Sequence, residues 1–313
     1  MNSKKFKYVY GPVPSRRLGR SLGVNPIPLK TCNYSCVYCQ LGRTLHLINE
    51  RQKFFPKEDI LDEIIEAVSL NRNKIDFITF VGEGEPTLYS GIGDLIKMIQ
   101  DYTPMPLAVI TNGALFYDSD VRRALKSSSV LLPTLDAPDE KKWKLINRPH
   151  PDLKFDTVLD GLFQMREEMK GEMWLEVMLM KGINDDDDTL YRLGEIIKDL
   201  KPHRVYINVP IRPPAEPWVE VPDDDTLRKA TKILGAIPLG SVEEGTFYVK
   251  DDEDPFIAIL NIIKRHPMRR KQIEKVAQEH GWNKDSLIES LRKSDLVEVV
   301  SSHGTEFFRY RLS

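Results

Sequence analysis

Between residues 20 and 210, short apolar runs alternate with longer segments in which apolar residues recur at helical spacing. Residues 57–70 place Ile60, Ile64 and Val68 on one helix face, and 75–81 is a mostly apolar run typical of a buried strand. The alternation predicts six strand–helix units. A helix is expected after each of the first five strands, and the sixth strand begins the last unit. The strands are expected at 21–25, 75–81, 107–110, 130–135, 173–180 and 204–209, and the helices at 57–70, 91–102, 118–126, 155–169 and 187–200.

Strands that alternate with helices of about 10–15 residues predict an α/β fold with a parallel sheet and right-handed crossovers. Such a sheet is either open or curled towards a barrel. In both cases the ligand-binding residues lie at the carboxyl ends of the strands. The polar residues that follow each predicted strand are therefore the first candidates for a functional site.

The pattern changes after the acidic segment 251–254 and Pro255, where we expect an interdomain boundary. Three short helices are predicted, followed by two strands that a turn separates. This order predicts a large domain over 1–250 and a small winged-helix-like domain over 255–313. A docking or dimerisation module is an equally good interpretation. The helices are expected at 256–265, 269–280 and 284–294, and the strands at 296–300 and 307–312.

Charge is unevenly divided between these two parts. The chain has 313 residues and a formal net charge of −2, whereas residues 255–313 alone carry 11 Lys and Arg against 7 Asp and Glu. The surplus permits an anionic partner for the C-terminal part, such as RNA bound through its phosphates. The basic residues concerned are Lys264, Arg265, Arg269, Arg270, Lys271, Lys284, Arg292 and Lys293.

The composition, with 41% hydrophobic and 29% charged residues, is that of an ordinary soluble protein. The N-terminus is basic but has no apolar segment after it, so no signal peptide is expected. No run is long and apolar enough for a membrane span. We therefore expect a cytoplasmic protein with reduced thiols and no membrane partner.

All three cysteines lie in one loop directly after the first predicted strand. Cys32, Cys36 and Cys39 have the spacing C-x3-C-x2-C, and the sequence has no fourth cysteine. Three thiolates from one loop hold three irons of a [4Fe–4S] cluster and leave the fourth iron open to another ligand. A structural zinc site is the weaker alternative, because it would need a further ligand such as His46.

This spacing, with the aromatic Tyr38 immediately before the third cysteine, resembles the radical S-adenosylmethionine superfamily. The resemblance implies a partial (βα)6 TIM-like barrel, a [4Fe–4S] cluster and S-adenosylmethionine as cofactors, and an electron donor such as flavodoxin or ferredoxin. In that family the cofactor chelates the open iron. Its reductive cleavage gives methionine and a 5′-deoxyadenosyl radical that abstracts hydrogen. Tyr38 would then pack near the adenine, or else serve only to stabilise the loop.

Further motifs of that family match at the ends of the next strands. The second strand runs into Gly82-Glu83-Gly84-Glu85-Pro86, in which Gly84 would let the backbone approach the cofactor and Glu85, or less well Glu83, would accept from its ammonium group. The third and fourth strands end in short polar residues suited to a ribose or a carboxylate. These are Thr111, Asn112 and Asp136, although Asn112 and Asp136 would serve equally well as helix caps.

The later strand ends supply candidates for a deeper pocket. Glu176 lies within an apolar strand, so it is expected to face the barrel lumen and to pair with a polar partner such as Arg148. Asn208 follows on the sixth strand, with Arg212 just beyond it. Before the first strand, a group of arginines would suit an anionic substrate, although surface solvation is expected for at least one of them. This group is Arg16, Arg17 and Arg20.

Two segments, 14–19 and 135–150, are similar to a branch that includes wyosine-type tRNA-modifying enzymes, with a likeness over roughly residues 10–240. Wyosine-forming members have additional N-terminal cysteines for a second cluster, which this sequence lacks. The sequence thus predicts a radical enzyme acting on an unidentified substrate, with tRNA or another RNA as one class. The competing hypothesis is an iron–sulfur regulator whose cluster state controls nucleic-acid binding.

Overall fold

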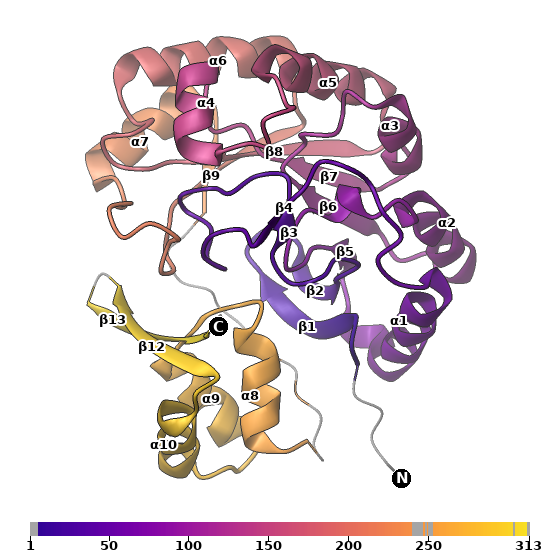
Figure 1. Cartoon of the computed structure of the whole chain (residues 1–313), viewed down its shortest axis with the longest axis vertical. Coiled ribbons are helices and arrows are strands. Elements are labelled where there is room, and N and C mark those ends of the chain that lie inside the picture. The colour runs from indigo at the N-terminus through magenta and orange to yellow at the C-terminus, as the bar shows by residue number, and fades with distance from the viewer. Residues whose placement is uncertain (1–5, 240–246, 248, 250–252, 303, 312–313) are drawn as a thin grey trace.

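The computed structural model describes residues 6–239, 247, 249, 253–302 and 304–311 (Figure 1). Its main feature is an eight-stranded sheet with the order β1-β2-β5-β6-β7-β8-β9-β10. All neighbouring strands are parallel except β1 and β2, which are antiparallel. The strands are β1 (Val9–Ser15), β2 (Gly19–Val24), β5 (Phe77–Phe80), β6 (Leu107–Thr111), β7 (Val130–Pro133), β8 (Glu172–Met178), β9 (Arg204–Asn208) and β10 (Ile237–Pro238).

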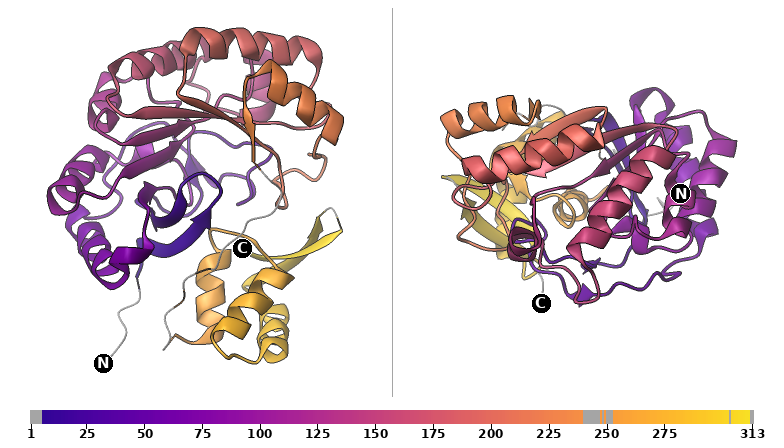
Figure 2. Two further views of the ribbon diagram at one scale, coloured as in Figure 1. Left: turned by 180° about the vertical axis from the view of Figure 1, so that it is seen from behind. Right: turned by 90° about the horizontal axis from the view of Figure 1, so that it is seen from above.

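Helices follow the parallel strands and cover the convex face of the curved sheet (Figures 1 and 2). Among the described residues, no helix is long and apolar enough to cross a membrane. The six predicted strands correspond to β2, β5, β6, β7, β8 and β9, so the expected α/β partial barrel is confirmed. The helices of this part are α1 (Lys57–Asn71), α2 (Ile92–Tyr102), α3 (Ser119–Leu125), α4 (Glu140–Asn147), α5 (Phe155–Glu168), α6 (Asp187–Leu200) and α7 (Asp224–Ile233).

Several elements of this part are absent from the expected pattern, among them β1, α4, α7 and the two-residue strand β10. The edge strand β1 contains Pro12 and Pro14, and prolines are tolerated at an edge because they have no N–H to donate to a neighbour. The helices α4 and α7 are short and mostly polar, so their periodicity is weak. Each is preceded by an N-cap aspartate whose side chain accepts from a backbone N–H of the first turn, Asp139 for α4 and Asp223 for α7.

One buried carboxylate ties β1 to the helical layer. Glu63 on α1 accepts from the backbone N–H groups of Lys7, Tyr8 and Val9 at 2.7–3.1 Å. Its side chain lies in the core, where an acceptor without donors would be costly. Glu63 therefore fixes the start of the strand whose other end leads into the arginine-rich turn at 16–18.

The C-terminal part has its own hydrophobic core, built around Ile259, Ile273 and Leu291. Its three helices accompany an antiparallel sheet of order β11-β13-β12. The winged-helix-like assignment and the domain division stay predictions. Asp251 and Asp252, which belong to the acidic segment at the expected boundary, lie outside the described residues. The elements are α8 (Pro255–Ile263), β11 (Met268–Arg269), α9 (Arg270–Glu279), α10 (Lys284–Lys293), β12 (Val297–Ser302) and β13 (Thr305–Tyr310).

The Glu63 anchor is testable by stability. In Glu63→Gln, an NH2 group that cannot accept replaces one carboxylate oxygen, so the free energy of unfolding should fall by about 1–3 kcal/mol. Equilibrium urea denaturation at neutral pH measures this change. The exposed neighbour Asp62→Asn is the matched control and should change stability by less than about 0.5 kcal/mol. Wild-type stability in Glu63→Gln would contradict the anchoring role.

Candidate active site

The cysteine loop leaves the end of β2 and is held on the barrel by backbone hydrogen bonds. Cys32 ends the short strand β3 (Thr31–Cys32), which pairs with β4 (His46–Leu47). The N–H groups of Ser35 and Val37 donate to carbonyl groups of Asn147 and Ile146 at the end of α4, both at 2.9 Å. The loop that carries the three thiols is therefore fixed by its neighbours in the fold.

Hydrogen-bond donors are directed at the sulfur atoms of Cys32 and Cys36. The backbone N–H of Tyr34 lies 3.4 Å from Cys32 Sγ, and Asn112 Nδ2 lies 3.7 Å from the same atom. Asn147 Nδ2 lies 3.5 Å from Cys36 Sγ. Donors placed in this way favour sulfur atoms that carry negative charge, such as the thiolates that hold an iron–sulfur cluster.

Without a metal the thiols are strongly biased towards the protonated form. Burial raises the pKa of Cys36 to about 12 and the pKa of Cys32 well above its usual value. Burial also raises the pKa of Cys39, against the opposing effect of the Lys30 charge. Cluster binding would thus release protons from these thiols.

The described residues contain no group of three or more His, Cys, Asp or Glu side chains placed to hold a metal ion. A cubane cluster does not need such a group, because each thiolate ligates a different iron. The three cysteines on one fixed loop, with amide donors at two sulfurs, fit a [4Fe–4S] cluster with one open iron. His46, one of the histidines that the zinc alternative could use, has an exposed side chain on β4.

The loop after β5 is packed directly against the cysteine loop. Glu85 N–H donates to the carbonyl oxygen of Thr31 at 3.0 Å. A Cβ at Gly84 would lie only 1.8 Å from that same oxygen, so no other residue fits without moving the backbone. Gly84 was expected to let the backbone approach a cofactor. In the structure its backbone instead packs closely against Thr31 of the cysteine loop.

Glu85 is 2% exposed and its carboxylate accepts from four donors. These are the N–H and hydroxyl of Thr87 at 3.0 and 2.6 Å, the hydroxyl of Thr111 at 2.6 Å and the N–H of Asn112 at 2.7 Å. Burial raises the pKa of Glu85, and these donors oppose the shift. Two of the donors are hydroxyls, which can rotate away and leave lone pairs for an ammonium group. Glu83 instead pairs with Arg265, at 3.2 Å.

Asp136, after β7, is the centre of a second buried network. It accepts from Tyr38 Oη at 2.6 Å, Asn147 Nδ2 at 2.8 Å and the N–H of Met178 at 2.8 Å. Burial raises the pKa of Asp136 to about 6, although the donors oppose this change. Asp136 is no helix cap, since the N-cap of α4 is Asp139. Asn112 is not a helix cap either, since the N-cap of α3 is Asp118.

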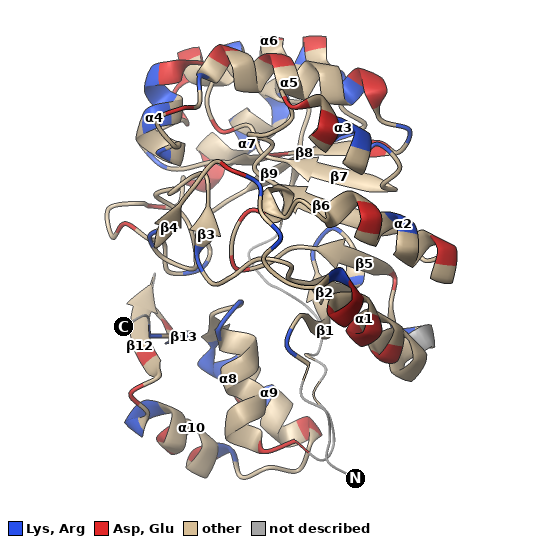
Figure 3. Ribbon diagram, turned by 45° about the vertical axis from the view of Figure 1, so that its right-hand side comes forward, with Lys and Arg blue, Asp and Glu red and all other residues tan. Residues whose placement is uncertain are grey.

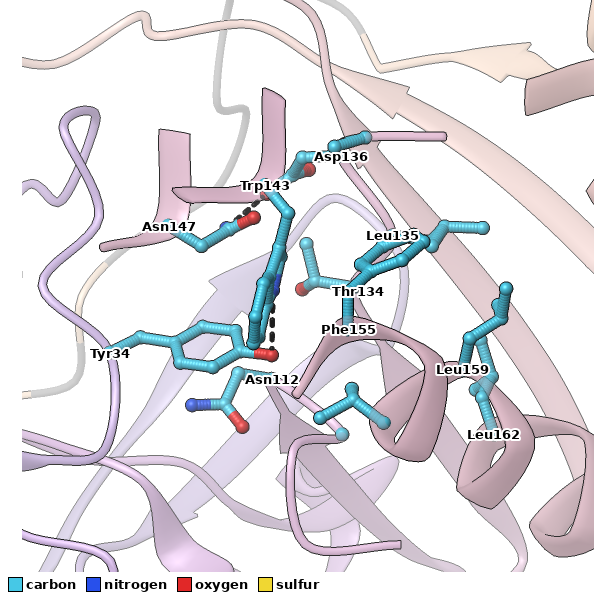
Figure 4. A pocket seen from close by; sticks show the side chains of 13 residues that line it. Tyr34, Asn112, Thr134, Leu135, Asp136, Trp143, Asn147, Phe155, Leu159 and Leu162 are labelled. Carbon is cyan, nitrogen blue, oxygen red and sulfur yellow. Dashed lines mark hydrogen bonds between the residues drawn. The ribbon is translucent and has the colours of Figure 1, made fainter. Parts of the chain in front are cut away.

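Asn147 was not predicted as a site residue, although its neighbour Arg148 was a candidate partner for Glu176. Its amide joins Cys36 to Asp136, beside a small cavity of about 20 Å³ that both Asn112 and Asp136 also line (Figure 4). In the same view Trp143 donates to the Tyr34 hydroxyl at 3.0 Å. The signal that could have revealed Asn147 is a polar residue at the end of a short helix, next to a motif already noted.

Glu176 faces the barrel interior as expected, but its partner was predicted wrongly. It forms an ion pair with Arg17, whereas Arg148 pairs with Glu216 at 2.5 Å. Arg148 ends α4 with a left-handed backbone conformation, and its side chain reaches the 211–221 segment. The Arg17 side chain comes from the β1–β2 turn, which the sequence pattern did not place inside the barrel.

The other two N-terminal arginines point in different directions. Arg16 Nη2 donates to Asn208 Oδ1 at the end of β9, at 2.9 Å. Arg20 pairs with Asp76 at 2.7 Å, and both of these side chains are exposed. The expectation that at least one of the three arginines lies in solvent is thus met by Arg20.

The predicted site residues gather around two spaces at the carboxyl ends of the strands. Tyr38, Glu176 and Asn208 line a larger cavity of about 340 Å³, together with Cys39. Asn112 and Asp136 line the small cavity. The other predicted residues contact the cysteine loop or one another: Gly84 packs against Thr31, and the Thr111 hydroxyl donates to Glu85 at 2.6 Å.

A family model described as the radical SAM superfamily matches residues 27–194. The chain is 36% identical over 299 residues to the UPF0026 protein MJ1312 of Methanocaldococcus jannaschii, over 93% of this chain and 92% of that protein. It is also 40% identical over 307 residues to a protein of Brachyspira hyodysenteriae named GTPase Obg, over 95% of this chain but only 44% of that protein's length.

Among solved structures, a radical SAM methyltransferase from Sphaerobacter thermophilus has a similar fold. The TM-score is 0.55 at 17% sequence identity, over 70% of this chain and 64% of that one. This likeness concerns the fold, while the family match rests on the sequence. The chain belongs to the radical SAM superfamily of enzymes, which use a [4Fe–4S] cluster and S-adenosylmethionine as cofactors.

Proposed function

We propose that this chain cleaves S-adenosylmethionine at a [4Fe–4S] cluster held by Cys32, Cys36 and Cys39. These thiolates would hold three of its irons, and the bound, reduced cluster would supply the one-electron reductive cleavage of S-adenosylmethionine to methionine and a 5′-deoxyadenosyl radical for hydrogen abstraction from the substrate. The observation that carries this proposal is the set of amide donors aimed at the sulfurs of Cys32 and Cys36, in a fixed loop that holds three thiols.

The residues proposed to seat the cofactor surround that loop. The Glu85 carboxylate would accept hydrogen bonds from the ammonium group of S-adenosylmethionine. The hydroxyls of Thr87 and Thr111, which donate to Glu85 here, would rotate away. Asn112 and Asp136 lie against the cysteine loop, through Cys32 Sγ and Tyr38 Oη, and would offer polar atoms to the ribose or carboxylate of the cofactor. Tyr38, held by Asp136 at 2.6 Å, would pack near the adenine. The remaining proposed contacts are Gly84, Thr111, Glu176 and Asn208.

RNA is one proposed substrate class, because the sequence resembles wyosine-type enzymes and the C-terminal part carries surplus positive charge. Several of its basic side chains are engaged in local ion pairs, which reduce their attraction for phosphates. These pairs are Arg270–Glu274, Arg292–Glu306 and Lys293–Glu289. The alternative of an iron–sulfur regulator leaves the polar residues at the strand ends without a role.

Cofactor cleavage is the direct test of this proposal. After anaerobic reconstitution and reduction with dithionite, the wild-type chain should bind about 4 iron atoms and convert S-adenosylmethionine to 5′-deoxyadenosine, detected by mass spectrometry. Cys36→Ser should lose the product because it loses a cluster ligand. Ser90→Ala, at an exposed position, is the control for reconstitution and should match the wild type. A cluster-loaded wild-type chain that forms no 5′-deoxyadenosine would contradict the proposal.

Asn147→Ala tests the link between the cysteine loop and Asp136. The variant loses one donor to Cys36 Sγ and one to Asp136, so 5′-deoxyadenosine formation should slow by about 10–100-fold, the usual cost of removing an outer partner of a metal ligand. Product formation and iron content are measured on the same reconstituted samples. Asn73→Ala, at an exposed position, should retain the wild-type rate. Equal rates in Asn147→Ala and Asn73→Ala would show that this link has no role.

A further inference from the structure

Lys30 is a buried lysine that lies just before Cys32, the first proposed cluster ligand. Only 3% of the residue is exposed, and its backbone has a left-handed conformation, with a φ of 57°. Its N–H donates to the carbonyl oxygen of Glu83 at 2.6 Å, and its own carbonyl oxygen accepts from the N–H groups of Leu45 and His46 at 3.1 and 3.0 Å. The position of Lys30 is therefore fixed by the loop after β5 and by the segment that leads into β4.

The ammonium group of Lys30 lies against the part of the loop that carries Cys39. Its Nζ donates to the carbonyl oxygen of Leu41, and the N–H of Leu41 donates to the Cys39 sulfur. Burial lowers the pKa of Lys30 to about 8, and the charges of Cys39 and Cys32 oppose this change. Leu41 thus connects a buried cation to one of the proposed cluster ligands.

A buried charge is costly unless groups of opposite charge compensate it. The charges with the largest effect on Lys30 are those of Cys39, Arg309 and Cys32, and Arg309 itself pairs with Glu298 at 2.8 Å. Figure 3 shows acidic residues of α1 and α2 on the outer helical layer, apart from β3, which Lys30 directly precedes. The negative charge that compensates Lys30 is thus expected from the cysteine sulfurs, which carry it once they ligate iron.

We propose that Lys30 supplies a buried positive charge beside Cys39 that favours one-electron reduction of the cluster by its redox partner. Reduction adds one negative charge to the cluster, and a fixed cation stabilises that charge more strongly in a protein interior than in water. Net charge and hydrogen bonds around the ligating sulfurs set the reduction potential of such clusters. The inference rests on the proposed function, since it concerns the cluster that the three cysteines are proposed to hold.

The reduction potential of the cluster tests this role without any turnover. The full-length, reconstituted chain is titrated anaerobically without S-adenosylmethionine, at neutral pH and constant ionic strength, and the reduced cluster is followed by electron paramagnetic resonance. Lys30→Met removes the charge, so the one-electron reduction equilibrium should shift at least about tenfold towards the oxidised form, or about 59 mV. Lys97→Met, at an exposed lysine on α2, is the matched control and should stay within about twofold of the wild type.

Two further variants separate the charge of Lys30 from its hydrogen bond. Lys30→Gln keeps an N–H donor for Leu41 but has no charge, so it should shift the equilibrium in the same direction as Lys30→Met. Lys30→Arg keeps a cation and should lie closer to the wild type than either neutral variant. Thermal unfolding and iron content are recorded for every variant. If Lys30→Met does not fold or does not bind the cluster, Lys30→Gln takes its place.

Three results would overturn the inference: wild-type potentials in both neutral variants, an equal shift in Lys30→Arg, or loss of the cluster from all three variants. Loss from the neutral variants alone would support the need for a cation at this position. Failure of the proposed function is distinguishable. In that case the wild type forms no 5′-deoxyadenosine, yet its reduction potential still depends on the Lys30 charge. A wild type that binds no cluster would contradict both.

Discussion

The buried carboxylate of Glu85 joins the parts of the molecule on which the active site depends. Removing an ionised carboxylate from water costs several kcal/mol, and this cost is offset only when its lone pairs meet donors. Here four donors come from its own loop and from the end of β6, while its backbone N–H is bonded to Thr31 of the cysteine loop. The absence of a Cβ at Gly84 permits that contact. One residue thus sets the distance between the proposed cluster ligands and the proposed cofactor seat.

A similar principle governs the opposite side of the site. Asp136 is also buried and accepts three hydrogen bonds, and its partner Tyr38 belongs to the cysteine loop while its partner Asn147 donates to Cys36 Sγ. Glu176 is balanced by Arg17, which the β1–β2 turn delivers into the barrel. The antiparallel strand added to the parallel sheet therefore has a chemical consequence, because it brings positive charge to the cavity beside Cys39.

The parallel sheet and the location of the site were predictable because they depend on local patterns. Apolar periodicity identified six strands, and the polar residues at their ends led to Asn112, Asp136 and Glu176, which line the two cavities at the carboxyl ends of the strands. The partners of these residues were not predictable in the same way. The pairing of Glu176 with Arg17 depends on how a proline-containing edge strand folds back, and the role of Asn147 depends on the docking of α4 against the cysteine loop. Both are tertiary contacts without a sequence period.

The central claim is that the three cysteines hold a cluster whose fourth iron is open to S-adenosylmethionine. Electron paramagnetic resonance of the reduced, reconstituted chain, recorded before and after addition of S-adenosylmethionine, tests it most directly. The account predicts that the signal of the reduced [4Fe–4S] cluster changes its g values on addition, because a ligand of the open iron has changed. An identical spectrum in the presence of saturating S-adenosylmethionine would contradict it.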